Sequence, residues 1–183
     1  MIQKIGNWLR MLLNRKPTPQ PYPSPMPNPP DLGVYISNTE ARALIIAQLG
    51  DKITSFGRQH LHFADTEYYC PALDYVKKVL AVTRVDGIQY RAQVLDCEDF
   101  AKLLMAKFVE DAYRAVKDAN GVPTNKVIRR AAHCFGLIHG NLPGPHAQNF
   151  VITDDKILRI VEPQTDDIFL PGDTIKSVWL MLA

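Results

Sequence analysis

Apolar residues recur at the spacing of an α-helix in four stretches of the chain. They predict helices over residues 2–15, 38–49, 71–82 and 98–117. The second of these follows Ser37, which forms a capping box with Glu40, and Gly50 is a stop signal at its end. The last has the clearest apolar face, formed by Phe100, Leu103, Leu104, Phe108 and Ala112.

Alternating apolar and polar residues, and short apolar runs between turn residues, predict the strands. These strands cover residues 59–63, 131–138, 147–153, 157–162 and 175–182, and a further extended run covers Tyr90–Asp96. A short basic helix is predicted at 126–130. Because helices dominate the first half of the chain and strands the second, we expect an α+β domain in which a helix packs on an antiparallel sheet.

The two strands around Asp154 predict a β-hairpin whose turn has three residues, 154–156. This turn pairs residue 150 with 160 and residue 152 with 158, so that the even-numbered apolar residues face the core. On the same face, His146 lies opposite Gln164 and diagonally beside Glu162, within reach of its side chain. Asn149 points to the other face. A two-residue turn would flip one strand and separate His146 from Glu162.

The first 30 residues differ from the rest. Residues 1–16 predict an amphipathic helix, and residues 17–30 hold eight of the fourteen prolines, which predict a stiff extended spacer. Residues 31–183 are then the folded domain. A short helix is marginal alone in water, so we expect residues 1–16 to dock on a protein partner or another copy of the chain, a reading we favour over a membrane surface.

Charge and cysteine content exclude several classes of protein. Residues 1–16 carry four basic residues and no acid, so removing them from the net charge of +2 leaves −2 for the remainder. A slightly acidic body lacks the basic surface of a nucleic-acid binder. Three cysteines argue against a disulfide framework. With no signal peptide and no apolar run long enough for a membrane span, we expect a cytoplasmic or virion-associated protein.

Cys97 stands where the extended run gives way to the helix over 98–117. In the first helical turn, unpaired N–H groups and the positive end of the helix dipole favour a thiolate, which is the nucleophilic form. The alternative is that Cys97 is a small buried apolar residue, as most free cysteines are. A catalytic thiolate also needs a base and a group that orients the base. His146 follows a loop rich in proline and glycine, where a side chain reaches a cleft, although a lone histidine is more often structural.

Three short motifs occur in a fixed order: Asp96–Ala101 (Asp-Cys-Glu-Asp-Phe-Ala), Pro145–Asn149 (Pro-His-Ala-Gln-Asn) and Val161–Thr165 (Val-Glu-Pro-Gln-Thr). Together they resemble the motifs of the papain-like cysteine peptidase domain found in Marasmius oreades agglutinin, a domain that also occurs alone in bacteria and phages. The resemblance covers roughly residues 35–183. It implies a papain-like fold preceded by the amphipathic helix and the spacer.

The resemblance also implies roles for individual residues. Cys97 is the nucleophile, His146 the general base and then acid, and Glu162 the orienting carboxylate. The oxyanion hole uses the backbone N–H of Cys97, with Gln93 as the candidate helper and Gln164 as a supporting residue. The family's activity depends on calcium, which implies that Glu98 and Asp99 are the metal ligands here. Glu98 replaces the usual aspartate and Pro145 the usual glycine; an acidic pair at a helix N-terminus is also explained by electrostatics alone.

Three functions follow from these expectations. The first is a cysteine hydrolase, a peptidase or amidase, that acts on a protein or peptide through a thioester intermediate. The second is a non-catalytic structural or interaction module of a larger assembly, such as that of a phage, which keeps the fold. The third is a peptidoglycan amidase or endopeptidase. Transfer of the acyl group to an amine instead of water is also open.

Overall fold

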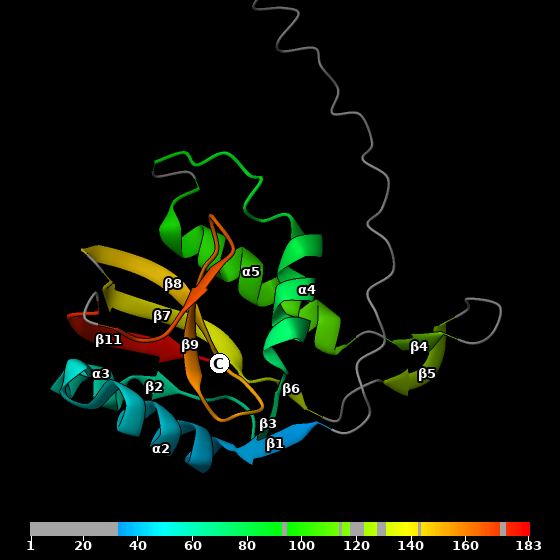
Figure 1. The fold of residues 1–183 in the computed structure, drawn as a ribbon, viewed down its shortest axis with the longest axis horizontal. Coiled ribbons are helices and arrows are strands. Elements are labelled where there is room, and N and C mark those ends of the chain that lie inside the picture. Colours follow the sequence, from blue (N-terminus) through cyan, green and yellow to red (C-terminus); the bar gives the residue numbers. More distant parts are fainter. Residues whose placement is uncertain are drawn as a thin grey trace, which may run out of the picture.

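Six strands pair into one large sheet, and helices cover it on both sides (Figure 1). The computed structural model describes residues 33–92, 95–113, 115–117, 123–127, 131–142, 144–172 and 175–183. The predicted helix over 1–16, the spacer over 17–30 and Gln93 lie outside the described residues.

The large sheet has the strand order β10-β9-β8-β7-β11-β2. Its strands are β2 (Leu61–His62), β7 (Phe135–Asn141), β8 (Pro145–Ile152), β9 (Leu158–Glu162), β10 (Asp167–Phe169) and β11 (Ser177–Leu182). All neighbours are antiparallel except β11 and β2. The smaller pairings join β1 (Val34–Ser37), β3 (Glu67–Cys70) and β6 (Ala132–His133), and separately β4 (Ala115–Lys117) and β5 (Pro123–Val127).

The helices form a layer on each face of the large sheet. They are α2 (Asn38–Leu49), α3 (Ser55–Gln59), α4 (Leu73–Thr83) and α5 (Cys97–Ala112), with a 3₁₀ turn at Gly50–Lys52. The buried side of α2 packs with Phe150 and Ile160 of the sheet. Both α4 and α5 pack with Val151 and Val161, which alternate with those residues and therefore lie on the opposite face. Figure 1 shows α4 and α5 together on one side of the sheet and α2 on the other.

The register of the β8–β9 hairpin confirms the prediction from the sequence. Phe150 pairs with Ile160 and Ile152 with Leu158, as a three-residue turn requires. The prediction placed the core on the even-numbered face alone. The structure has a second apolar core on the odd-numbered face, because α4 and α5 cover Val151 and Val161 completely.

Three of the differences from the sequence-based expectation have a common cause. The helix that begins at Cys97 ends at Ala112, and residues 115–117 instead form β4, paired with β5. The same pairing makes residues 126–127 part of a strand, where a helix was expected. The run from Tyr90 to Asp96 is not a continuous strand, since Arg91 and Leu95 exchange backbone hydrogen bonds with each other. In each case, pairing with a segment nearby in the chain outweighs the local pattern.

The observed mixture of helices and an open sheet is the α+β class that the sequence predicted. Strands β1 and β3 come before and between the first helices, so the two kinds of element are less segregated along the chain than expected. Within the described part of the chain, no helix combines the length and apolar character required to cross a bilayer.

Candidate functional site

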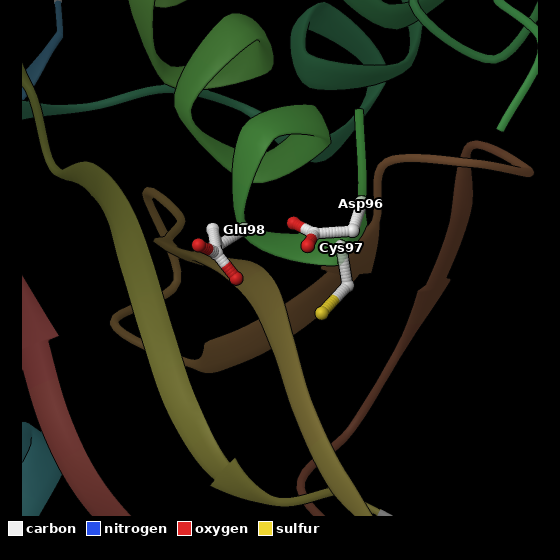
Figure 2. A group of neighbouring side chains, drawn as sticks. All are labelled: Asp96, Cys97 and Glu98. Atoms are coloured by element: carbon white, nitrogen blue, oxygen red, sulfur yellow. The ribbon is translucent and has the colours of Figure 1, made fainter. Parts of the chain in front are cut away.

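Cys97 is the first residue of α5 and its side chain is half-buried. It packs against a small apolar cluster of Ala101 from α5, Leu137 from β7 and Ala147 from β8. Figure 2 shows the side chains of Asp96, Cys97 and Glu98 projecting from the start of the helix. The backbone N–H groups of Asp99 and Phe100 both bond to the carbonyl oxygen of Asp96, so the first turn is well formed. The thiol therefore has the predicted position at a helix N-terminus.

Two carboxylates lie close to this thiol. Ligand atoms of Asp96, Cys97 and Glu98 lie within 4.8 Å of one another, and Oδ1 of Asp96 is buried without a hydrogen bond from a described residue. Calcium prefers six to eight oxygen ligands, whereas this set offers two carboxylates and a sulfur. Glu98 and Asp99, the predicted ligands, instead approach the Lys102 ammonium group at 3.8 and 3.3 Å. Calcium binding at Glu98 and Asp99 stays a prediction, and no step of the chemistry below depends on it.

His146 and Glu162 are brought together by the β8–β9 register. The distance from Nε2 of His146 to Oε2 of Glu162 is 2.9 Å. Both side chains are largely covered, with 23% and 14% of their surface exposed. The turn length predicts this contact, and it is present in the structure. A carboxylate in such a contact is able to orient a histidine side chain.

Glu162 is held as a carboxylate. Burial raises its pKa, but hydrogen bonds from His146, Gln148 and the backbone N–H of Gln164 outweigh that effect, so that the pKa is lower than the ordinary value. An ionised carboxylate only accepts hydrogen bonds. Nε2 of His146 is therefore the protonated nitrogen, and in the neutral imidazole Nδ1 is the basic one.

This lowered pKa predicts an acid-sensitive contribution to stability. Ionised Glu162 stabilises the fold above its unfolded-state pKa, near 4.5, and that contribution is lost as the pH falls through the lower folded-state pKa. Urea unfolding of the wild type and Glu162→Gln, from pH 5.5 down to pH 3, measures it. We expect the difference in unfolding free energy to shrink with falling pH; a difference that stays constant would contradict the prediction.

The structure does not join Cys97 to His146 by a hydrogen bond, as judged over residues 33–92, 95–113 and 144–172. The residue that packs with Cys97 is Ala147, which follows His146 in β8. Successive side chains of a strand point to opposite faces, so His146 is adjacent to the thiol along the backbone and is directed away from Ala147. By this alternation, the Cys97 cluster and the His146–Glu162 pair lie toward opposite faces of β8.

The remaining predicted residues divide into two kinds. Gln164 contributes its backbone N–H, which donates to Oε1 of Glu162 at 3.2 Å, and its side chain makes no hydrogen bond to another described residue. Asn149 points to the other face, as expected. It is completely buried, and its Nδ2 donates to the carbonyl oxygens of Ala101 in α5 and Gly136 in β7, at 2.9 and 3.0 Å. Asn149 therefore fastens the helix that carries Cys97 to the sheet.

Two polar features were not predicted. The first is the hydrogen bond that Gln148 donates to Glu162. The sequence feature that could have indicated it is a polar glutamine at an even-numbered, core-facing position of β8. The second is a buried cluster in which Asp111 of α5 accepts hydrogen bonds from Tyr75 of α4 at 2.9 Å and from Nε2 of His133 of β6 at 2.8 Å. No sequence spacing indicated it, because its members come from three separate elements.

The chain matches no protein-family model and no curated protein. Among solved structures, it is similar to a complex of PSL1a with E64, with a TM-score of 0.63, 15% identity and coverage of 81% of this chain and 51% of that one. It is also similar to Polyporus squamosus lectin bound to the human-type influenza-binding epitope Neu5Aca2-6Galb1-4GlcNAc, with a TM-score of 0.60, 17% identity and coverage of 81% and 49%. The chain thus spans about half the length of these structures.

These similarities correct the description expected from the motifs. The motif resemblance implied a peptidase, whereas the similar solved structures are those of a lectin, a carbohydrate-binding protein. The description as a thiol protease is wrong on this comparison. At 15–17% identity the likeness concerns the fold alone. By its fold, the described part of the chain is similar to Polyporus squamosus lectin.

Proposed function

We propose that the chain is a cysteine hydrolase that cleaves an acyl bond, an amide or an ester, through a thioester at Cys97. The observation that carries this proposal is the hydrogen bond between His146 and Glu162, at 2.9 Å, beside the strand position against which Cys97 packs. A helix that begins with the cysteine and lies on an antiparallel sheet supports it, and a papain-like arrangement of the three residues is part of the proposal.

The proposal requires that Nδ1 of His146 approach Sγ of Cys97, a contact that the described residues do not make. Glu162 accepts a hydrogen bond from Nε2–H of His146 and stays ionised, which leaves Nδ1 to take the proton of the Cys97 thiol. Sγ then attacks the acyl carbon, and the bond to the leaving group breaks as His146 returns the proton to that group. Water attacks the resulting thioester, with His146 again taking a proton, and releases the acid and the free thiol. The helix N-terminus favours the developing negative charge.

A direct test is covalent labelling by E64, whose epoxide is opened by thiolates and which the similar PSL1a structure binds. We expect one equivalent to add to the wild type and none to Cys97→Ala, as measured by intact mass and peptide mapping. The other two cysteines are fully buried, and the hydrogen bond with Cys70 together with burial raises the pKa of Cys134. Both should stay unmodified in the folded protein.

Burial alone slows labelling of Cys70 and Cys134, so the comparison among the three cysteines is not sufficient. The decisive quantity is the iodoacetamide rate of Cys97 relative to that of free glutathione at neutral pH. An activated thiolate reacts faster than glutathione, whereas an equal or lower rate, together with no E64 adduct, contradicts the proposal. Purified bacterial cell walls then test whether the bond that is cleaved is a peptidoglycan amide.

A second candidate is a carbohydrate-binding module without catalysis. The similar Polyporus squamosus lectin is bound to a carbohydrate epitope, and no described hydrogen bond links Cys97 to His146. The chain covers about half of that lectin, so its ligand is carried over only as a proposal. Calorimetric titration with the same trisaccharide tests it. Binding that is unchanged in Cys97→Ala, without thiol activation, favours this candidate over the hydrolase.

A further inference from the structure

Gln148 is a buried polar residue on an apolar face of the sheet. Only 3% of its surface is exposed, and it lies on β8 two residues from Phe150 and directly opposite Ile138 of β7, both of which are fully buried. A buried amide is costly unless it is hydrogen-bonded. Its neighbours on this face offer one polar side chain with which it bonds, Glu162.

The amide of Gln148 meets the same carboxylate oxygen as the histidine. Nε2 of Gln148 lies 2.8 Å from Oε2 of Glu162, and Nε2 of His146 lies 2.9 Å from that atom. The backbone N–H of Gln164 donates to the other oxygen, Oε1, at 3.2 Å. The carboxylate is thus held by three donors, two of them on the oxygen that faces the imidazole.

The chemistry of the two groups fixes the orientation of the Gln148 amide. A carboxylate that only accepts hydrogen bonds requires the NH₂ group, and not the carbonyl, to face it. As a result Oε1 of Gln148 is buried and accepts no hydrogen bond from the described residues. An orphaned buried acceptor is uncommon. The unpaired Oε1 indicates that the hydrogen bond from Nε2 to Glu162 determines how the Gln148 amide is oriented.

We infer that Gln148 is a positioning residue that fixes the Glu162 carboxylate so that Oε2 faces Nε2 of His146. It acts through Glu162 and does not touch the reacting atoms. The catalytic meaning of this role rests on the proposed function, whereas the contact itself does not. Its consequence is a single imidazole tautomer, with the proton on Nε2 and Nδ1 left as the base.

Two substitutions test this role by NMR. Gln148→Met keeps the volume and removes the donor, so the pKa of Glu162 should rise by about one unit, the size expected for one hydrogen bond to a charged group. The ¹⁵N shifts of His146 should change from the Nε2–H form to a mixture of tautomers. Gln148→Glu places a second acid beside Glu162, and the two carboxyl groups should then titrate as a coupled pair with one strongly raised pKa.

Gln164→Met is the matched control, because it changes a neighbouring glutamine and keeps the backbone donor to Glu162. It should leave the pKa of Glu162 and the tautomer of His146 unchanged. Equal effects of Gln148→Met and Gln164→Met, or no effect of either Gln148 variant, would overturn the inference. E64 labelling of the same samples reports separately on Cys97, so a shifted Glu162 pKa without labelling supports the positioning role while contradicting the hydrolase.

Discussion

Replacing His146 with glutamine is expected to slow the reaction of Cys97 with E64 by about 100-fold or more at neutral pH, the size typical of a lost general base. Glutamine keeps a polar side chain that can contact Glu162, but it cannot take the thiol proton. The second-order rate constant, measured by intact mass between pH 5 and pH 9, shows the loss. The variant should regain reactivity only at high pH, where the thiol ionises without help.

The matched control is His62→Gln. His62 is an exposed histidine of β2, at the far edge of the large sheet from β9 and β10, and it should react at the wild-type rate. A His146→Gln variant that labels as fast as His62→Gln over the whole pH range would show that the imidazole does not activate Cys97. The chain would then be better explained as a binding module.

Removing the carboxylate of Asp111 is expected to have the largest effect on stability. Asp111→Ala deletes the acceptor shared by Tyr75 and His133, in a site where Asp111 is 1% exposed. Removing one partner of a buried, hydrogen-bonded pair of ionisable groups typically lowers the free energy of unfolding by about 3–5 kcal/mol. A loss of this size is a large share of the stability of a single domain. Denaturant unfolding followed by circular dichroism measures it.

Asp74→Ala provides the comparison, because it removes an exposed carboxylate of α4 that pairs with Lys77 at 3.5 Å. Exposed ion pairs of this kind contribute about 0–1 kcal/mol. Asp111→Asn, which keeps one acceptor oxygen, should fall between the two alanine variants. If Asp111→Ala proves as mild as Asp74→Ala, the buried cluster does not connect α4, α5 and β6 in the way that the contacts indicate.

The sequence predicts the part of the candidate site that depends on strand register. Turn length and alternation in the β8–β9 hairpin are local properties, and they place His146 beside Glu162 correctly. The start of α5 at Cys97 also follows from local signals. These features need only the residues of one hairpin or one helix, so a single sequence is sufficient to predict them.

Features that depend on distant elements are missed. The odd-numbered face of β8 and β9 contains Asn149 and Arg159, and its burial becomes evident only when α4 and α5 are seen to cover it. The end of α5 depends on the pairing of β4 with β5, which competes with the helical pattern. The contact between Gln148 and Glu162 is also invisible in either strand alone. In each case, the missing information is which surfaces meet after folding.

The two hydrogen bonds of Asn149 have a mechanical consequence. The bond to Ala101 ties the second turn of α5 to β8, and the bond to Gly136 ties β8 to β7, so sliding of the helix along β8 would break the first bond in the buried interior. The distance between residue 97 and β8, the strand that carries His146, is therefore set by this buried contact and does not depend on the connecting loops.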